Sequence, residues 1–186
     1  MPAVDTAAVD TAAVDTAAVH TVIDSPYGPL TLVAADGATL SGLYVLDQRH
    51  RPGDEGFGHP DPAPFDEVAR QIAAYFEGRL TRFDVPLDLR GTPFQRRVWA
   101  GLLEIPYGET MSYGELARHI GAAGASRAVG LANGKNPVSI IVPCHRVIGA
   151  DGSLTGYGGG LERKRRLLEL EGALPSGAGD RQDALF

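Results

Sequence analysis

Cysteine is almost absent from this chain of 186 residues, which contains only Cys144. A single cysteine excludes an intrachain disulfide and any structural zinc site built on several cysteines. No run of 18 or more apolar residues is present, which excludes a transmembrane helix, and no basic segment followed by an apolar core marks a signal peptide. These absences predict a soluble intracellular protein, located in the cytoplasm.

The charges are unevenly distributed along a chain of otherwise globular composition, with 44% hydrophobic and 22% charged residues. Residues 1–88 carry 5 basic and 14 acidic side chains, a net of −9, whereas residues 89–175 carry 11 basic and 7 acidic, a net of +4. Residues 176–186 contribute −1, and the total is −6. A basic C-terminal half leaves a polyanionic partner open, although a net of +4 is also ordinary surface variation.

Residues 3–19 repeat the pentad Ala-Val-Asp-Thr-Ala, within a predicted tail that covers residues 1–19. A period of five matches neither a helix nor a strand, so no continuous apolar face forms. The pattern predicts a disordered, low-complexity tail, with a docking role as the alternative. Residues 176–186 are predicted to form a second, flexible tail.

Residues 20–88 have the pattern of a small α/β or α+β domain. Short β-rich runs at 21–24, 30–34 and 40–46 are separated by turn signals. A Pro-, Gly- and Asp-rich segment at 49–64 predicts a long loop. Helical spacing of apolar residues then predicts a helix over 66–77.

Residues 89–175 form a second predicted domain. Thr92 and Pro93 begin a helix, and Ser112 with Glu115 is the pattern of a capping box for a short helix. A further short helix is expected from Ser126 to about residue 134. Two short helices joined by a small-residue turn indicate a helix-turn-helix, although an ordinary helical hairpin has the same pattern.

The segment after these helices contains the single thiol. An apolar β-branched run at 138–142 predicts a strand that ends at Pro143, directly before Cys144. Asp151 and Gly152 are a hairpin signal, and a basic-then-apolar helix is expected over 161–171.

Cys144 is a candidate nucleophile, although a lone cysteine is more often a small buried hydrophobic residue. The adjacent His145 and Arg146 both favour a thiolate. Adjacent residues in an extended segment point to opposite sides, so a bridging water is the natural route for the thiol proton to His145. The imidazole then needs an orienting carboxylate, and Glu171 is one candidate among several acidic residues.

The glycines at 156–160 leave two interpretations open. They could cradle a phosphate, but no Lys-Ser or Lys-Thr follows them. A loop that passes close to a flat ligand fits equally well.

The segment Pro143-Cys144-His145-Arg146-Val147 resembles the signature of the O6-alkylguanine-DNA alkyltransferases, the methylated-DNA–protein-cysteine methyltransferases. Further segments in the same order resemble that family: 106–113, 126–130, 136–138, 154–161 and 168–172. The resemblance covers about residues 21–172. It implies an α+β fold, with a small ribonuclease-H-like sheet-and-helix domain and a C-terminal winged helix-turn-helix domain that carries the cysteine.

The resemblance also implies a role for each matching residue in catalysis. Cys144 would accept the alkyl group, and His145, through a water, and Glu171 would generate its thiolate. Tyr113 would help to extrude the damaged nucleotide and donate a proton to the leaving guanine. The residues that would form or support the guanine pocket are Val147, Tyr157, Gly158, Gly159 and Asn136.

On the DNA side, the resemblance implies that Arg127 fills the space left by the flipped nucleotide. The positions that would approach the DNA backbone or groove are Tyr113, Gly114, Ala128, Gly130 and Ala150. An alkylated base within a duplex is out of reach unless it is flipped, and minor-groove contact suits a lesion that occurs in any sequence. The implied partner is double-stranded DNA that contains O6-alkylguanine, or O4-alkylthymine, bound by a monomer with cooperation on DNA left open.

Three departures from the family pattern are visible. Gly158 stands where many relatives have a serine, the cysteines that hold a zinc ion in some relatives are missing, and the pentads resemble nothing in the family. No metal or cofactor is therefore expected. Two other functions remain as alternatives: a non-catalytic module that binds alkylated DNA, which the presence of Cys144 disfavours, and a cysteine hydrolase.

Overall fold

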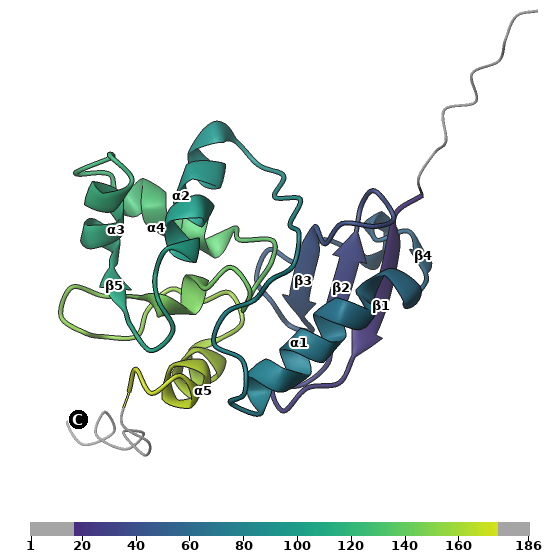
Figure 1. Cartoon of the computed structure of the whole chain (residues 1–186). Coiled ribbons are helices and arrows are strands. Elements are labelled where there is room, and N and C mark those ends of the chain that lie inside the picture. Colours follow the sequence, from purple (N-terminus) through teal and green to yellow (C-terminus); the bar gives the residue numbers. More distant parts are fainter. Residues whose placement is uncertain (1–16, 175–186) are drawn as a thin grey trace, which may run out of the picture.

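A four-stranded sheet forms the centre of the N-terminal half of the computed structural model, which describes residues 17–174 (Figure 1). The strands β1 (Val19–Ile23), β2 (Leu30–Ala34) and β3 (Gly42–Val45) are antiparallel neighbours. The short β4 (His59–Pro60) pairs in parallel with β1, which gives the order β3-β2-β1-β4. The three β-rich runs predicted from the sequence therefore form β1, β2 and β3.

The structure corrects two assignments in this half. β1 begins at Val19, the last residue of the predicted tail, and Val19 is buried; residues 1–16 lie outside the described residues. The segment 49–64 is not a simple loop, since it contains β4 and the 3-10 turns η1 (Asp54–Gly56) and η2 (Ala63–Phe65). A two-residue strand is too short to leave a periodic signal in the sequence.

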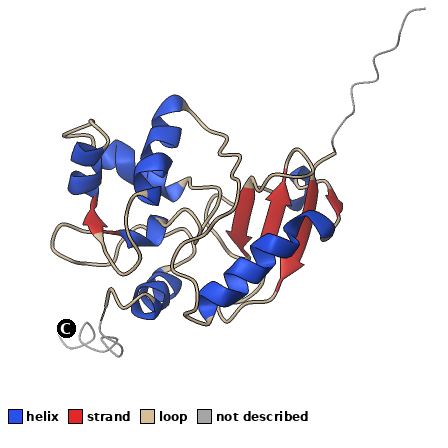
Figure 2. Ribbon diagram, viewed as in Figure 1, coloured by secondary structure: helices blue, strands red, loops and turns tan. Residues whose placement is uncertain are grey.

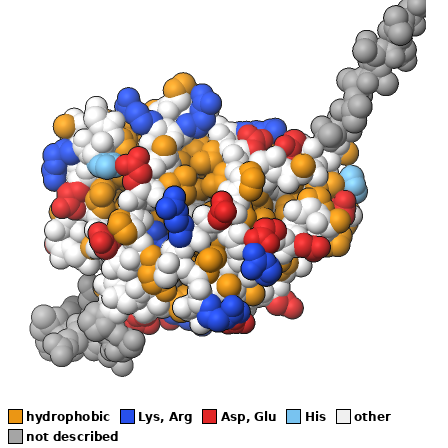
Figure 3. Space-filling view, viewed as in Figure 1, with side chains coloured by type: hydrophobic (Ala, Val, Ile, Leu, Met, Phe, Trp, Pro, Cys, Tyr) orange, Lys and Arg blue, Asp and Glu red, His pale blue; other side chains and the backbone are white. Residues whose placement is uncertain are grey.

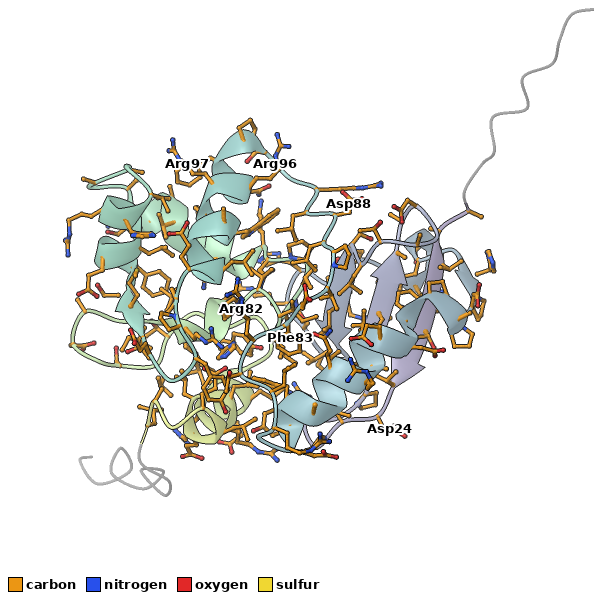
Figure 4. All side chains as sticks on the ribbon, in the orientation of Figure 1. Asp24, Arg82, Phe83, Asp88, Arg96 and Arg97 are labelled. Carbon is orange, nitrogen blue, oxygen red and sulfur yellow. The ribbon has the colours of Figure 1, made fainter. Side chains whose placement is uncertain are left out.

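Helix α1 (Asp66–Phe76) covers one face of this sheet (Figure 1). Its buried face includes Val68, Ile72 and Tyr75, as the helical spacing predicts. Residues 79–92 then pass between the two domains, where Leu87 forms a parallel bridge with Leu40 of the N-terminal domain. Figure 4 labels Arg82, Phe83 and Asp88 along this connection.

Helices dominate the C-terminal half, in contrast to the sheet of the N-terminal half (Figure 2). α2 (Pro93–Leu103) and α3 (Tyr113–His119) each start with a complete capping box, from Thr92 with Gln95 and from Ser112 with Glu115. α4 (Ser126–Gly134) packs against both of these helices, and α5 (Leu161–Leu170) closes the domain. The predicted helix-turn-helix is thus α3 and α4.

The segment on either side of Cys144 differs from the prediction. Residues 138–142 do not form a strand: only Val138 makes a bridge, to Leu43, and the chain then turns with Ile140 at a φ of 73°. The turn at residues 151–152 makes no hairpin, because β6 (Val147–Ile148) pairs in parallel with β5 (Met111–Ser112). An apolar β-branched run is compatible with a buried turn as well as with a buried strand, so the sequence pattern does not distinguish the two.

One hydrophobic core extends across both domains. It includes Leu43 of the sheet, Tyr75 of α1, Trp99 of α2 and Val142 beside the thiol. The Trp99 indole also donates to the carbonyl of Ala132 at 2.9 Å, which joins α2 to α4. Basic and acidic side chains are interspersed on the face drawn in Figure 3. None of the helices in residues 17–174 is long and apolar enough to cross a membrane.

Candidate active site

Cys144 begins a 3-10 turn, η3 (Cys144–Arg146), and its carbonyl accepts a hydrogen bond from Asn133 Nδ2, near the end of α4, at 3.4 Å. The thiol residue is 4% exposed. Asn136, just after α4, donates from Nδ2 to the carbonyl of Val142 at 2.8 Å and accepts from the Val138 amide at 3.0 Å. These two hydrogen bonds hold the turn that precedes the thiol, so the position of Cys144 is coupled to that of α4.

His145 and Glu171 form a buried pair beside the thiol. The imidazole Nε2 lies 2.8 Å from Glu171 Oε1, and both side chains are inaccessible to solvent. A carboxylate can only accept a hydrogen bond, so we assign the imidazole proton to Nε2, which leaves Nδ1 as a proton acceptor. Nδ1 has no hydrogen-bond partner among the described residues. There is accordingly no direct hydrogen bond between the Cys144 thiol and the His145 imidazole, although the segment is a 3-10 turn rather than an extended strand.

Arg146 pairs with Glu171 rather than with the thiol. Its Nε donates to Glu171 Oε2 at 2.8 Å, and its two terminal nitrogens donate to Glu171 Oε1 at 3.0 Å and to the Ile105 carbonyl at 2.6 Å. The structure thus shows a partner of Arg146 that the sequence did not predict, the buried Glu171 carboxylate. Its guanidinium neutralises the buried carboxylate instead, because its side chain leaves the turn on the side of α5.

The pKa values of this group follow from burial and from these hydrogen bonds. Burial would raise the pKa of Glu171, but the bonds from His145 and Arg146 outweigh it and lower that pKa to about 2. Burial lowers the pKa of His145 against the opposing effect of Glu171. Burial raises the pKa of the Cys144 thiol, while the Asn136 side chain and the Lys164 ammonium act in the opposite direction. At neutral pH the site thus contains an ionised carboxylate, a neutral imidazole and a thiol that needs a base.

Lys164 of α5 is the cation that acts on the thiol, and sequence reasoning missed it. Its side chain is fully buried, and Nζ donates to the carbonyls of Val147 at 2.5 Å and Thr155 at 2.6 Å. Burial lowers the pKa of Lys164 to about 8. Residues 163–166 resemble an exposed basic helix face, which hid it. The helical spacing could have revealed its burial, because Lys164 lies three residues before Leu167 and seven before Glu171, on the buried face of α5.

Tyr113 connects α3 to the loop that contains Thr155. Its hydroxyl donates to the Thr155 carbonyl at 2.9 Å, so this carbonyl accepts from Tyr113 and Lys164 together. A Cβ at Gly156, where φ is 69°, would lie 2.7 Å from the Tyr113 hydroxyl oxygen. The glycine permits this close approach and keeps the phenol at the edge of the site.

Two of the residues expected to form the guanine pocket, Val147 and Tyr157, lie close to the thiol, and Gly158 and Gly159 follow Tyr157 in the loop. Val147 is buried and follows the Cys144 turn, and burial raises the pKa of Tyr157, with a smaller contribution from the charge of Cys144. The carbonyl of Gly158 accepts from the Arg49 amide of the N-terminal domain at 2.8 Å. The carbonyl of Gly159 accepts from Arg163 at 2.9 Å. The loop is thus anchored by both domains.

The residues expected to contact DNA do not share one environment. Arg127 and Ala128 are exposed on α4, as is Ala150 on the loop after β6. Gly130 instead faces the Tyr113 ring, where a Cβ would lie 3.7 Å away, and Gly114 is half-buried near Ser126. α4 also exposes Leu131, at 71%, which sequence reasoning did not single out. Within residues 17–174, no group of three His, Cys, Asp or Glu side chains is placed to hold a metal ion.

Comparisons with known proteins agree with this arrangement. Residues 18–89 match the ribonuclease-like domain of the 6-O-methylguanine DNA methyltransferases, and residues 93–173 match their DNA binding domain. The two domains and the buried thiol thus define a DNA methyltransferase of the cysteine-acceptor class. This chain belongs to the methylated-DNA–protein-cysteine methyltransferase family, which confirms the resemblance and the fold class expected from the sequence.

Individual relatives are similar over most of their length. The methylated-DNA–protein-cysteine methyltransferase of Mycobacterium tuberculosis (strain H37Rv) is 63% identical over 152 residues, which cover 82% of this chain and 91% of that protein. The protein of the same name from Methanosarcina acetivorans is 49% identical over 154 residues, with 83% and 98% covered. The crystal structure of Mycobacterium tuberculosis OGT in complex with DNA superposes with a TM-score of 0.78 at 63% identity, covering 82% of this chain and 92% of that one.

Proposed function

We propose that this chain repairs DNA by transferring the alkyl group of O6-alkylguanine to Cys144. The observation that carries the proposal is the buried His145–Glu171 pair beside the only cysteine, in a fold whose relatives are named for this reaction. The Cys144 sulfur attacks the saturated carbon, a C–S bond forms, and the C–O6 bond breaks with its electron pair left on guanine. The relative crystallised with DNA supports a DNA duplex as the partner, and we place the reaction in the cytoplasm.

Thiolate formation is assigned to the pair formed by His145 and Glu171. The free Nδ1 of His145 accepts the thiol proton through a bridging water, and Glu171 holds the ring in the tautomer that makes Nδ1 the acceptor. The resulting imidazolium is stabilised by the carboxylate, whose pKa of about 2 keeps it ionised. Lys164 stabilises the thiolate from the opposite element, α5.

The leaving guanine is assigned to the pocket between Tyr113 and the loop at 155–160. Tyr113 donates the proton that the departing base requires, and burial, which raises the pKa of its phenol, keeps that proton in place until then. Tyr157, Gly158 and Gly159 line the pocket together with Val147. Since Gly158 offers no hydroxyl, the substrate oxygen receives its hydrogen bonds from backbone amides.

DNA binding is assigned to the exposed face of α4. Arg127 enters the stack in place of the flipped nucleotide, and Ala128 allows a groove to approach the helix closely, whereas Gly130 faces the Tyr113 ring. Gly114 and Ala150 lie where the DNA backbone passes, and Asn136 connects α4 to the thiol turn.

The product is a thioether, which water does not cleave, so each chain reacts once. Mass spectrometry after incubation with methylated duplex tests the proposal: one added methyl group on the peptide that contains Cys144 is expected. The matched control is Cys144→Ser, which should stay unmodified. Repeated turnover on an ester or peptide without a stable adduct would instead indicate a cysteine hydrolase. DNA binding with no adduct would indicate a non-catalytic module.

A further inference from the structure

A tyrosine of the N-terminal domain reaches the carboxylate of the active-site pair. The Tyr75 hydroxyl, on α1, donates to Glu171 Oε1 at 2.6 Å, across 96 residues of sequence. Tyr75 is completely buried. Its ring packs against Phe83 of the connection labelled in Figure 4, at 5.2 Å between centroids, and against Tyr107 at 6.2 Å. The phenol is therefore held in place on several sides.

The oxygen that accepts from Tyr75 is the one that accepts from His145. Glu171 Oε1 receives hydrogen bonds from Tyr75, from His145 Nε2 and from one nitrogen of Arg146, while Oε2 receives the second bond from Arg146. Each donor withdraws negative charge from the oxygen and weakens its attraction for the others. Tyr75 thus limits how strongly Glu171 stabilises the protonated form of His145.

We propose that Tyr75 is a positioning residue for alkyl transfer, so that the N-terminal domain completes the group that activates Cys144. The inference rests on the proposed function. The role differs from mere domain docking, because Tyr75 donates to the carboxylate that orients His145, whereas other hydrogen bonds between the domains end on groups outside the His145–Glu171 pair. The Tyr27 hydroxyl, for example, donates to the Arg166 carbonyl of α5 at 2.8 Å.

The proposal predicts the direction of a pH effect. Besides Tyr75, the charged groups that act on His145 or Glu171 are Arg146 and Lys164, and Cys144 precedes His145 in the chain. Burial and the charge of Glu171 raise the pKa of Tyr27, Tyr107 and Tyr157, so these phenols stay neutral between pH 5 and 9. Arg146 keeps its charge throughout the working range. Burial and the neighbouring Glu171 raise the pKa of Tyr75, so it remains a donor over that range. Without the Tyr75 hydroxyl, Glu171 Oε1 keeps more of its negative charge and stabilises the protonated imidazole more strongly. The pKa of His145 therefore rises.

The test compares Tyr75→Phe with the matched control Tyr27→Phe. Single-turnover transfer from free benzylguanine to Cys144 is measured between pH 5 and 9, and adduct formation is followed by mass spectrometry. We expect the acid limb of the Tyr75→Phe profile to move up by about half to one pH unit, so that transfer at a fixed pH on that limb slows about three- to tenfold. Tyr27→Phe should leave the limb where it is in wild type.

A second variant covers the case in which Tyr75→Phe does not fold. A fluorotyrosine at position 75 keeps the ring packing and donates a stronger hydrogen bond, so the acid limb should move to lower pH. An unmoved limb in the folded variants, or equal slowing in both Phe variants at every pH, would overturn the role of Tyr75. Wild-type chain that forms no Cys144 adduct would overturn the proposed function itself.

Discussion

Replacement of Lys164 by Met tests the electrostatics of the thiol most directly. Met fills a similar volume but removes the buried ammonium and its bonds to the carbonyls of Val147 and Thr155. The Thr155 carbonyl keeps its bond from Tyr113, whereas the Val147 carbonyl loses its ammonium donor. The variant therefore removes a charge that favours the thiolate and leaves the rest of the site in place.

The expected rate change follows from two opposing effects. A neighbouring opposite charge shifts a pKa by about 1–3 units, so the thiolate fraction falls by about 10- to 1,000-fold in the variant. A thiolate of higher pKa is intrinsically more nucleophilic, with a Brønsted slope of about 0.5, which recovers half of this loss on the logarithmic scale. Transfer from free benzylguanine at pH 7 should thus slow about 3- to 30-fold. Because the pKa of Lys164 is about 8, the difference should shrink above that pH.

The stability of the variant should change little. Lowering the pKa of Lys164 from 10.5 to about 8 corresponds to a cost of about 3 kcal/mol for the buried charge, and its removal offsets the unpaired Val147 carbonyl, which costs about 1–3 kcal/mol. Urea unfolding measures this, and Arg165→Met, which removes an adjacent cation on the solvent side of α5, is the control. A Lys164→Met variant with the wild-type rate and pH profile would refute the reasoning, as would slowing that is constant up to pH 9.

Four further outcomes are expected. Cys144→Ala should abolish transfer but keep the fold and DNA binding, and residual transfer by the variant would exclude Cys144 as the acceptor. Arg127→Ala should slow repair of saturating methylated duplex roughly five- to thirtyfold, from a loss of about 1–2 kcal/mol, and leave the reaction with free benzylguanine almost unaffected. Equal slowing on both substrates would assign Arg127 another role. DNA affinity should fall as the salt concentration rises, with the log–log slope expected for about three to five neutralised phosphates. A slope near zero would exclude duplex DNA as the partner. Because the pKa of Glu171 is lowered from 4.5 to about 2, its ionised form contributes up to about 3 kcal/mol to the free energy of unfolding above pH 4.5, and this contribution is lost as the pH falls toward 2. The Glu171→Gln variant should show no such loss when its urea unfolding is measured over that range.

Much of the local structure follows from the sequence, because it depends on neighbouring residues. The capping boxes at Thr92 and Ser112, the helical spacing in α1 and the turn signals between strands act within a few residues. The Pro-Cys-His-Arg segment and the segments around it likewise indicated the family, which the comparisons confirmed. Local chemistry therefore predicted most of the elements, and it indicated the family and the class of reaction.

Only the tertiary structure decided which distant groups meet at the thiol. Nothing in the spacing could select Glu171 as the partner of His145, direct Arg146 to that carboxylate, or bring Tyr75 to it from another domain. Likewise, Lys164 stands in a basic run that resembles a solvated helix face, and only the packing of α5 buries it. These contacts depend on how the helices and the sheet pack around one shared core. Burial and hydrogen bonding between residues far apart in sequence, rather than residue type, thus set the protonation states on which the reaction depends.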